Sequence, residues 1–301
     1  MSALVRWVNA WDKPRRWCTV MRGIRCHVIG NAGGPLSEAS GDSGCITFNG
    51  GSPPIASSWH LDASSRRIPL SLASEIELKG QAPAEIVDAL GSALLATTKQ
   101  GSRELQCWPS TGFSIVHALW TAGAEVVVDR IRFDPSLCRE GLHGPRSAPA
   151  LAYHNWLGER RVTLARWFAS SPPGWRWSLP QTIAPSPGHG APATSIRTLL
   201  DAFERARSLR TLDDLTALAQ VHIAADPALL TVGPEAATSF DLERCFHLTR
   251  GVSETGNWWL YDDEGARVAQ ALAAQVRQAQ DVAFIQALNR RPASSRTTRV
   301  G

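Results

Sequence analysis

The alternation of apolar and polar residues predicts a β-rich first part of the chain. β-Branched and aromatic runs with partial period-two alternation cover residues 3–8 and 18–29, and a strand pair is expected over 66–78. Clusters of Gly, Pro, Asn, Asp and Ser separate these runs, as expected of turns. A further strand is predicted over 124–133, where the sequence reads AEVVVDRIRF.

Apolar residues at helical spacing predict helices between and after these strands. A helix over 82–100 places Ile86, Leu90 and Leu94 on one face, and a helix over 110–123 begins at Ser110 or Thr111. Capping residues and apolar stripes predict the other helices, which cover 155–169, 194–209, 211–225 and 262–291.

These elements predict an α+β protein with a β-rich N-terminal module and a helical C-terminal module. Residues 171–193 are rich in proline, glycine and serine, which favours a long loop or linker. The expected organisation is a β-rich module over 1–170, this linker, a helical module over 194–289, and a disordered basic tail over 290–301.

Composition and length indicate a globular protein. The chain has 301 residues, 44% of them hydrophobic, which is enough to bury a substantial core. We see no apolar run of about 18 residues and no apolar signal core at the N-terminus, so we expect no membrane contact and a cytoplasmic location. The six cysteines are scattered without a CxxC motif, which favours buried thiols over disulfides and predicts no metal site.

Basic residues are concentrated in three segments. Residues 1–25 contain six basic side chains and one acidic side chain, and residues 139–177 contain six basic and two acidic side chains. Residues 290–301 contain four basic side chains and no acidic one. Because the net charge of the whole chain is only +4, the remainder is acidic. This asymmetry predicts one surface that faces an anionic partner.

The first two basic segments also contain tryptophan, of which the chain has 12. Arginine neutralises phosphates, and aromatic rings stack on unpaired bases at about 1–3 kcal/mol per base. This combination favours binding of RNA or single-stranded DNA. The other interpretation is that Trp156 and Trp167, three helical turns apart, face the core, and that Arg160 and Arg161 form a solvated helix face. The residues expected to contact nucleic acid are Arg15, Arg16, Trp17, Arg22, Arg25, Arg160, Arg161, Arg166 and Trp167.

Two histidines lie beside these arginines and are candidates for catalysis. RNA can be cleaved without a metal ion when a histidine acts as general acid or base and arginines stabilise the charge on phosphorus. His27 follows Arg22 and Arg25, and His143 lies between Arg139 and Arg146. We find no GxxxxGK[ST] loop, no GxGxxG after a strand and no HExxH, and we therefore expect no cofactor.

Residues 41–48, GDSGCITF, contain two short motifs of hydrolases. GDSG resembles the serine motif of trypsin-like proteases, but only 40 residues precede it, too few for the barrel that carries the histidine and aspartate of that family. We therefore interpret GDSG as a turn. GCITF resembles the cleavage site of N-terminal-nucleophile cysteine hydrolases, and this resemblance implies Cys45 as the nucleophile and Asp62 as the group that positions its amine.

The sequence thus favours a prokaryotic nucleic-acid-binding protein that works within a ribonucleoprotein, defence or mobile-element complex, with metal-independent RNA processing as an added activity. Nucleic acid and other proteins are the expected partners. Two alternatives stay open. One is a self-processing cysteine amidohydrolase built on Cys45, and the other is a non-catalytic scaffold protein.

Overall fold

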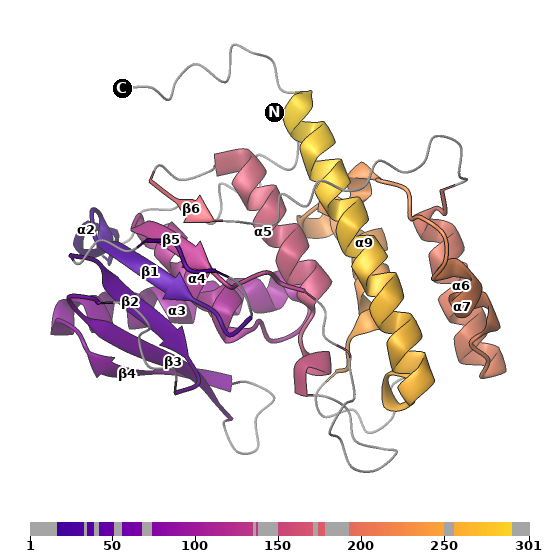
Figure 1. Ribbon diagram of the computed structural model, residues 1–301, viewed down its shortest axis with the longest axis horizontal. Coiled ribbons are helices and arrows are strands. Elements are labelled where there is room, and N and C mark those ends of the chain that lie inside the picture. Colours follow the sequence, from indigo (N-terminus) through magenta and orange to yellow (C-terminus); the bar gives the residue numbers. More distant parts are fainter. Residues whose placement is uncertain are drawn as a thin grey trace. The chain divides into compact units, whose positions relative to one another are not determined.

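Figure 1 shows the computed structural model of the chain. It describes residues 17–32, 35–38, 42–50, 56–67, 74–134, 137, 150–170, 174–177, 193–249 and 256–290. The chain has the predicted α+β arrangement, with a six-stranded mixed sheet built almost entirely from the N-terminal half and mostly helices in the C-terminal half. It packs as two compact units. Unit 1 comprises 1–133, 169–181 and 249–253, and unit 2 comprises 134–168, 182–248 and 254–301.

The sheet of unit 1 has the strand order β4-β3-β2-β1-β5-β6. All neighbouring strands are parallel except β3 and β4, which form an antiparallel pair. The strand order changes direction at β1, because β2 and β3 follow on one side of it and β5 and β6 lie on the other. The strand bounds are Arg25–Ile29 (β1), Gly44–Phe48 (β2), His60–Arg67 (β3), Ser74–Gln81 (β4), Glu125–Asp129 (β5) and Arg176–Trp177 (β6).

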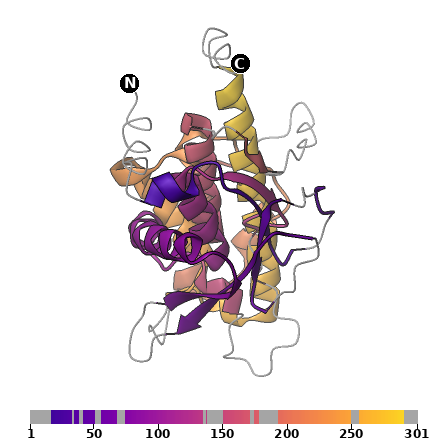
Figure 2. The ribbon, with the colours of Figure 1, turned by 90° about the vertical axis from the view of Figure 1, so that its left-hand side faces the viewer.

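Three helices of unit 1 gather on one side of this sheet (Figure 2). They are α2 (Trp17–Met21), α3 (Ala84–Leu105) and α4 (Thr111–Ala122). The stripe predicted for α3 is buried, and Ser110 caps α4 by accepting a hydrogen bond from the Phe113 amide at 3.1 Å. The strand expected over 18–29 was wrong for its first part, because residues 17–21 form α2. Packing of this helix against α3 and α4 buries Met21 completely, which outweighs the local β propensity.

Unit 2 is helical and has its own apolar core. Helices α6 (Ile196–Leu209) and α9 (Asp263–Asn289) each bury one apolar face in this core. Ser195 caps α6, and Ile196, Leu199 and Phe203 are buried as the spacing predicted. Asp262 caps α9 by accepting from the Gly265 amide at 2.8 Å. The helices of this unit are α5 (Trp156–Ser170), α6 (Ile196–Leu209), α7 (Asp213–Leu218), α8 (Ala237–Glu243) and α9 (Asp263–Asn289), with short 3-10 turns η1 (Ala150–Tyr153), η2 (Pro227–Leu230), η3 (Gly233–Ala236), η4 (Arg244–Phe246) and η5 (Trp258–Tyr261).

The two units divide the chain differently from the expected module boundaries. Residues 134–168, which include most of α5, pack in unit 2. Residues 176–177, inside the expected linker, form strand β6 of unit 1. The flanking tryptophans explain this placement, since Trp175 donates to the Ala124 carbonyl at 2.7 Å and Trp177 donates to the Ile131 carbonyl at 3.0 Å. The expected tail lies outside the described residues from 291 on.

Candidate active site

The two faces of the unit 1 sheet differ in chemistry. In-register residues of neighbouring strands point to the same face, and successive residues of one strand point to opposite faces. On the helix-covered face, Val128, Val28, Ile46 and Leu61 follow one another across the sheet and are all buried. The next row faces the other side and reads Arg176, Val127, His27, Cys45, His60 and Gln81. Since strands of parallel sheets usually consist of continuous apolar runs, this polar face needs a reason beyond packing.

His27 and Asp129 form a buried pair at the end of this face. Nε2 of His27 lies 2.7 Å from Oδ2 of Asp129, and the two side chains are 1% and 6% exposed. The loop after β1 covers the pair. Ser37 donates its amide to Oδ2 at 2.6 Å and its hydroxyl to Oδ1 at 2.9 Å. Asp129 ends β5 beside β1, where the strand order changes direction. Open parallel sheets usually bind ligands at the carboxyl ends of such neighbours, whereas the pocket next to His27 is lined by the first residues of β1 and β5.

The hydrogen bonds to Asp129 fix its charge and the tautomer of its partner. Burial raises the pKa of Asp129, but the bonds from Ser37 and His27 outweigh burial and hold this pKa below its ordinary value. Asp129 is therefore ionised at neutral pH and accepts from Nε2–H of His27. The lone pair of the neutral imidazole is then on Nδ1, which is buried and has no hydrogen-bond partner among the described residues.

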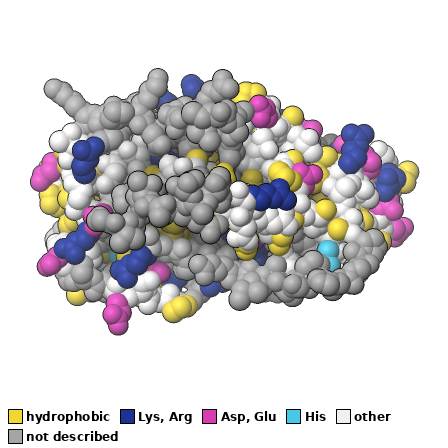
Figure 3. All heavy atoms as spheres, turned by 90° about the horizontal axis from the view of Figure 1, so that it is seen from above, with side chains coloured by type: hydrophobic (Ala, Val, Ile, Leu, Met, Phe, Trp, Pro, Cys, Tyr) yellow, Lys and Arg dark blue, Asp and Glu magenta, His cyan; other side chains and the backbone are white. Residues whose placement is uncertain are grey.

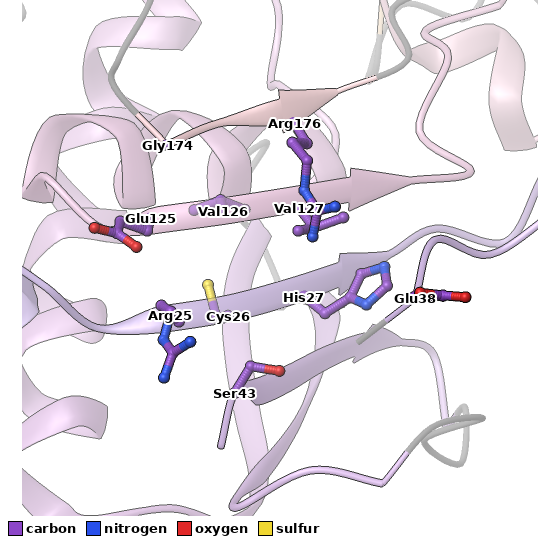
Figure 4. A pocket seen from close by; sticks show the side chains of 10 residues that line it. All are labelled: Arg25, Cys26, His27, Glu38, Ser43, Glu125, Val126, Val127, Gly174 and Arg176. Atoms are coloured by element: carbon purple, nitrogen blue, oxygen red, sulfur yellow. The ribbon is translucent and has the colours of Figure 1, made fainter. Parts of the chain in front are cut away.

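A pocket of about 200 Å³ adjoins this pair on the polar face (Figure 4). Two arginines line it, Arg25 on β1 and Arg176 on β6, and both are exposed. Two carboxylates, Glu38 and Glu125, also line the pocket, so its acidic and basic side chains are equal in number. The residues that line the pocket are Arg25, Cys26, His27, Glu38, Ser43, Glu125, Val126, Val127, Gly174 and Arg176.

Ser43 is the serine of GDSG, and it lines the same pocket as His27. It directly precedes β2 and continues the pairing of β2 with the next strand, because its carbonyl accepts from the Ser58 amide at 3.0 Å. Its neighbour Asp42 is in a turn, as expected, and forms only an exposed pair with Arg25 at 3.8 Å. The side chain of Ser43 is buried, at 6% exposure.

Cys45 and Asp62 do not contact each other in the way that the hydrolase resemblance implies. Cys45 is fully buried within β2, and burial raises the pKa of its thiol to about 11, which disfavours the nucleophilic thiolate. Asp62 instead accepts from the hydroxyl of Thr47 at 3.2 Å and from the amide of Gly50 at 2.9 Å. Thr47 in turn lies 2.9 Å from Nε2 of His60. This second histidine cluster is on the same face of the sheet but does not line the pocket.

The predicted nucleic-acid residues of the first basic segment lie partly outside the described residues. Arg15 and Arg16 are outside them, and so is the side chain of Trp17. Arg22 is exposed after α2, and Arg25 is half-exposed at the pocket. His143, the second catalytic candidate, also lies outside the described residues.

The predicted nucleic-acid residues of α5 are in unit 2, and their arginines are buried. Arg160 and Arg161 are 0% exposed, and Arg166 is 1% exposed. Arg160 donates Nε to Asp281 at 3.1 Å, and Arg161 donates Nε to Glu243 at 2.6 Å. These placements fit neither the predicted contact with a nucleic-acid backbone nor the solvated helix face, because both need guanidinium groups open to solvent.

Trp167 is half-buried on the same helix. On the face of the molecule in Figure 3, the described arginines and lysines lie among acidic side chains, without a broad patch of one sign.

Sequence reasoning found His27 but missed the groups that surround it. Asp129 ends β5, which pairs with β1, and Arg176 begins β6, which pairs with β5. Ser37 lies in a loop. The available signal was the polar residue that ends the apolar run VVVD, at the point where β5 ends.

Among the described residues, no three His, Cys, Asp or Glu side chains gather as metal ligands, and no helix is long and apolar enough to cross a membrane. Comparisons of the chain with protein-family models, with curated proteins and with solved structures found no match.

Proposed function

We propose that this protein binds and cleaves single-stranded nucleic acid, with RNA preferred, without a metal ion and with His27 as the general acid and base. The observation that carries the proposal is the hydrogen-bonded chain from Ser37 through Asp129 to His27, which leaves Nδ1 of His27 unpaired at a pocket lined by Arg25 and Arg176.

The geometry supports acid–base chemistry at Nδ1. Asp129 holds the imidazole in one tautomer and orientation, and its charge stabilises the imidazolium that forms when Nδ1 takes a proton. In the reaction, Nδ1 removes the proton from the attacking hydroxyl and returns a proton to the leaving oxygen. Arg25 and Arg176 line the same pocket, and in the proposed reaction their guanidinium groups stabilise the negative charge that develops on phosphorus oxygens.

The pocket favours a single phosphodiester over a large ligand or a duplex. Its volume of about 200 Å³ lies below the roughly 300–1,000 Å³ of sites for drug-sized ligands. Glu38 and Glu125 line the same pocket, and their charges oppose those of the arginines, which disfavours a ligand with several phosphates. A flexible single strand can present one phosphate to such a recess, whereas a rigid duplex cannot. Arg22 is exposed and lies three residues before Arg25 in the chain, so we propose it as a further contact to a phosphate.

Cleavage of labelled single-stranded RNA in excess EDTA tests the proposal, alongside binding of RNA and duplex DNA across a salt series. We expect cleavage by the wild type, a loss of about 10²–10⁴-fold in His27→Ala, and affinity that falls modestly with salt, because the slope scales with the number of phosphates contacted. His60→Ala is the matched control, since His60 lies on the same face and outside the pocket, and it should keep the wild-type rate. Absence of both binding at low salt and cleavage would contradict the proposal.

A further inference from the structure

We propose that Ser43 is a nucleophile, activated by His27 and Asp129, and that it forms a covalent intermediate with phosphorus. The inference rests on the proposed function for its substrate class, single-stranded phosphodiesters, but not for the nucleophile itself. Three observations carry it. Ser43 and His27 line one pocket, Nδ1 of His27 is buried without a hydrogen-bond partner, and Asp129 orients the imidazole from its other nitrogen.

The unpaired nitrogen points to a hydroxyl as its partner during the reaction. A buried polar atom without a partner is uncommon in native structures and requires an explanation, such as catalysis. The hydroxyl of Ser37 is not available to it, because it donates to Oδ1 of Asp129. Among the residues that line the pocket, Ser43 carries the one hydroxyl group. We therefore assign this hydroxyl to Nδ1 of His27 in the reaction, although the two atoms do not form a hydrogen bond in this structure.

The start of β2 places Ser43 on the same face of the sheet as His27, two residues before Cys45, the in-register partner of His27. The residue after Ser43, Gly44, is paired in register with Cys26, the residue before His27. A side chain at Gly44 would collide with the ring of Trp59, since an added Cβ would lie 1.9 Å from it. The glycine of GDSG therefore lets β2 lie against Trp59. The amide of Ser58 donates a hydrogen bond to the carbonyl of Ser43, and this bond holds the backbone of Ser43 in place.

This arrangement has the same groups as a serine–histidine–aspartate triad on a different fold. Such triads are defined by geometry and roles, and not by the order of their residues in the chain. Here the order is His27, Ser43, Asp129, and the residues come from β1, the start of β2 and the end of β5. GDSG resembles the serine motif of trypsin-like proteases, and its serine lines the same pocket as His27. The described sheet is not the barrel of those proteases.

The chemical step is balanced without a co-reactant. Oγ of Ser43 attacks phosphorus as Nδ1 of His27 takes its proton. The bond from phosphorus to the leaving sugar oxygen breaks, and that oxygen takes the proton from the imidazolium. Water, deprotonated by His27, then attacks phosphorus and releases Ser43 with its proton restored. Because the protein supplies the nucleophile, a strand without 2′-hydroxyls is also a substrate.

A fluorophosphonate probe tests the nucleophile directly, since its phosphorus forms a bond to an activated serine and fluoride leaves. The full-length protein is incubated with the probe, and the labelled peptide is identified by mass spectrometry. We expect labelling at Ser43 and no label at that position in Ser43→Ala. In His27→Ala and Asp129→Asn, the rate of labelling should fall by at least about 10²-fold. Ser58→Ala, just before β3, and His60→Ala and Asp62→Asn, on β3, are controls on the neighbouring strand and should label as the wild type does.

The outcomes separate this inference from the proposed function. Labelling of Ser43 without nucleic-acid cleavage supports the nucleophile and overturns the substrate class. RNA cleavage without labelling, and with single-stranded DNA left intact, supports His27 as the base and overturns Ser43 as the nucleophile. Labelling of another serine, or of Ser43 at an unchanged rate in His27→Ala, also overturns it. Far-ultraviolet circular dichroism and thermal unfolding of each variant show that it is folded, and Ser43→Gly, which also lacks the hydroxyl, replaces Ser43→Ala if the latter is not.

Discussion

His27 and Asp129 are 102 positions apart in the sequence, and their side chains meet at 2.7 Å on neighbouring parallel strands. The connection between those strands contains β2, β3, β4, α3 and α4, so the pair exists only when the sheet is complete. The pair thereby links the proposed activity to the folding of unit 1.

The pH dependence of stability should report on Asp129. Its pKa in the folded protein lies below the ordinary value, so its contribution to stability is fully present above the unfolded pKa of about 3.9 and is lost as the pH falls through the folded pKa. We expect urea unfolding to show a decline in stability below about pH 4 that is smaller in Asp129→Asn. An equally steep decline in that variant would contradict the hydrogen-bonded pair.

Arg161 should matter for stability and not for nucleic-acid binding. Removing one member of a buried ion pair typically costs about 3–5 kcal/mol, because the other charge is left unpaired. Arg161→Met should lower the free energy of unfolding by this amount, since Glu243 would lose its partner. Arg197→Met is the control. Arg197 forms an exposed pair with Asp201 at 3.2 Å, and the expected change is below about 1 kcal/mol. Weaker RNA binding by folded Arg161→Met would instead support the original prediction from sequence.

Two glycines should respond oppositely to alanine. Gly44→Ala places a Cβ 1.9 Å from the ring of Trp59, so it should destabilise unit 1 and displace Ser43. Gly91 lies inside α3 with no atom within 4 Å of an added Cβ, and Gly91→Ala should stabilise by about 0.5–1 kcal/mol through helix propensity. Thermal unfolding measures both changes. A stabilised Gly44→Ala would show that β2 does not lie against Trp59 in this way.

The thiol of Cys45 should be unreactive in the native protein. Burial raises its pKa to about 11, so the reactive thiolate is scarce at pH 8. We expect slow alkylation of Cys45 by iodoacetamide, faster alkylation of half-exposed Cys107, and rapid reaction of both in denaturant. Peptide mapping after timed quenching measures these rates.

The intact mass of the purified protein tests the cysteine amidohydrolase alternative at the same time. Self-processing at Cys45 removes residues 1–44, whereas we expect the mass of the full chain. Rapid native alkylation of Cys45, or loss of those residues, would favour that alternative.

The sequence was sufficient for the elements whose signals are local. Ser110 and Ser195 cap helices because their side chains reach amides three residues ahead, and the stripe of α3 is buried because its spacing matches one helical face. His27 was identified from its neighbours in the chain, Arg22 and Arg25. Each of these predictions depends on interactions within a few residues.

The tertiary structure alone decided which groups surround His27 and what the arginines of α5 do. Asp129, Arg176 and Ser43 reach the same face because β1 pairs in register with β2 and β5, and β5 pairs with β6, and no local pattern encodes that order. Likewise, Arg160 and Arg161 are buried because Asp281 and Glu243, which are distant in sequence, compensate their charges. A local pattern gives the period of a strand or helix, but the partner across a sheet or core is set by packing of the whole chain.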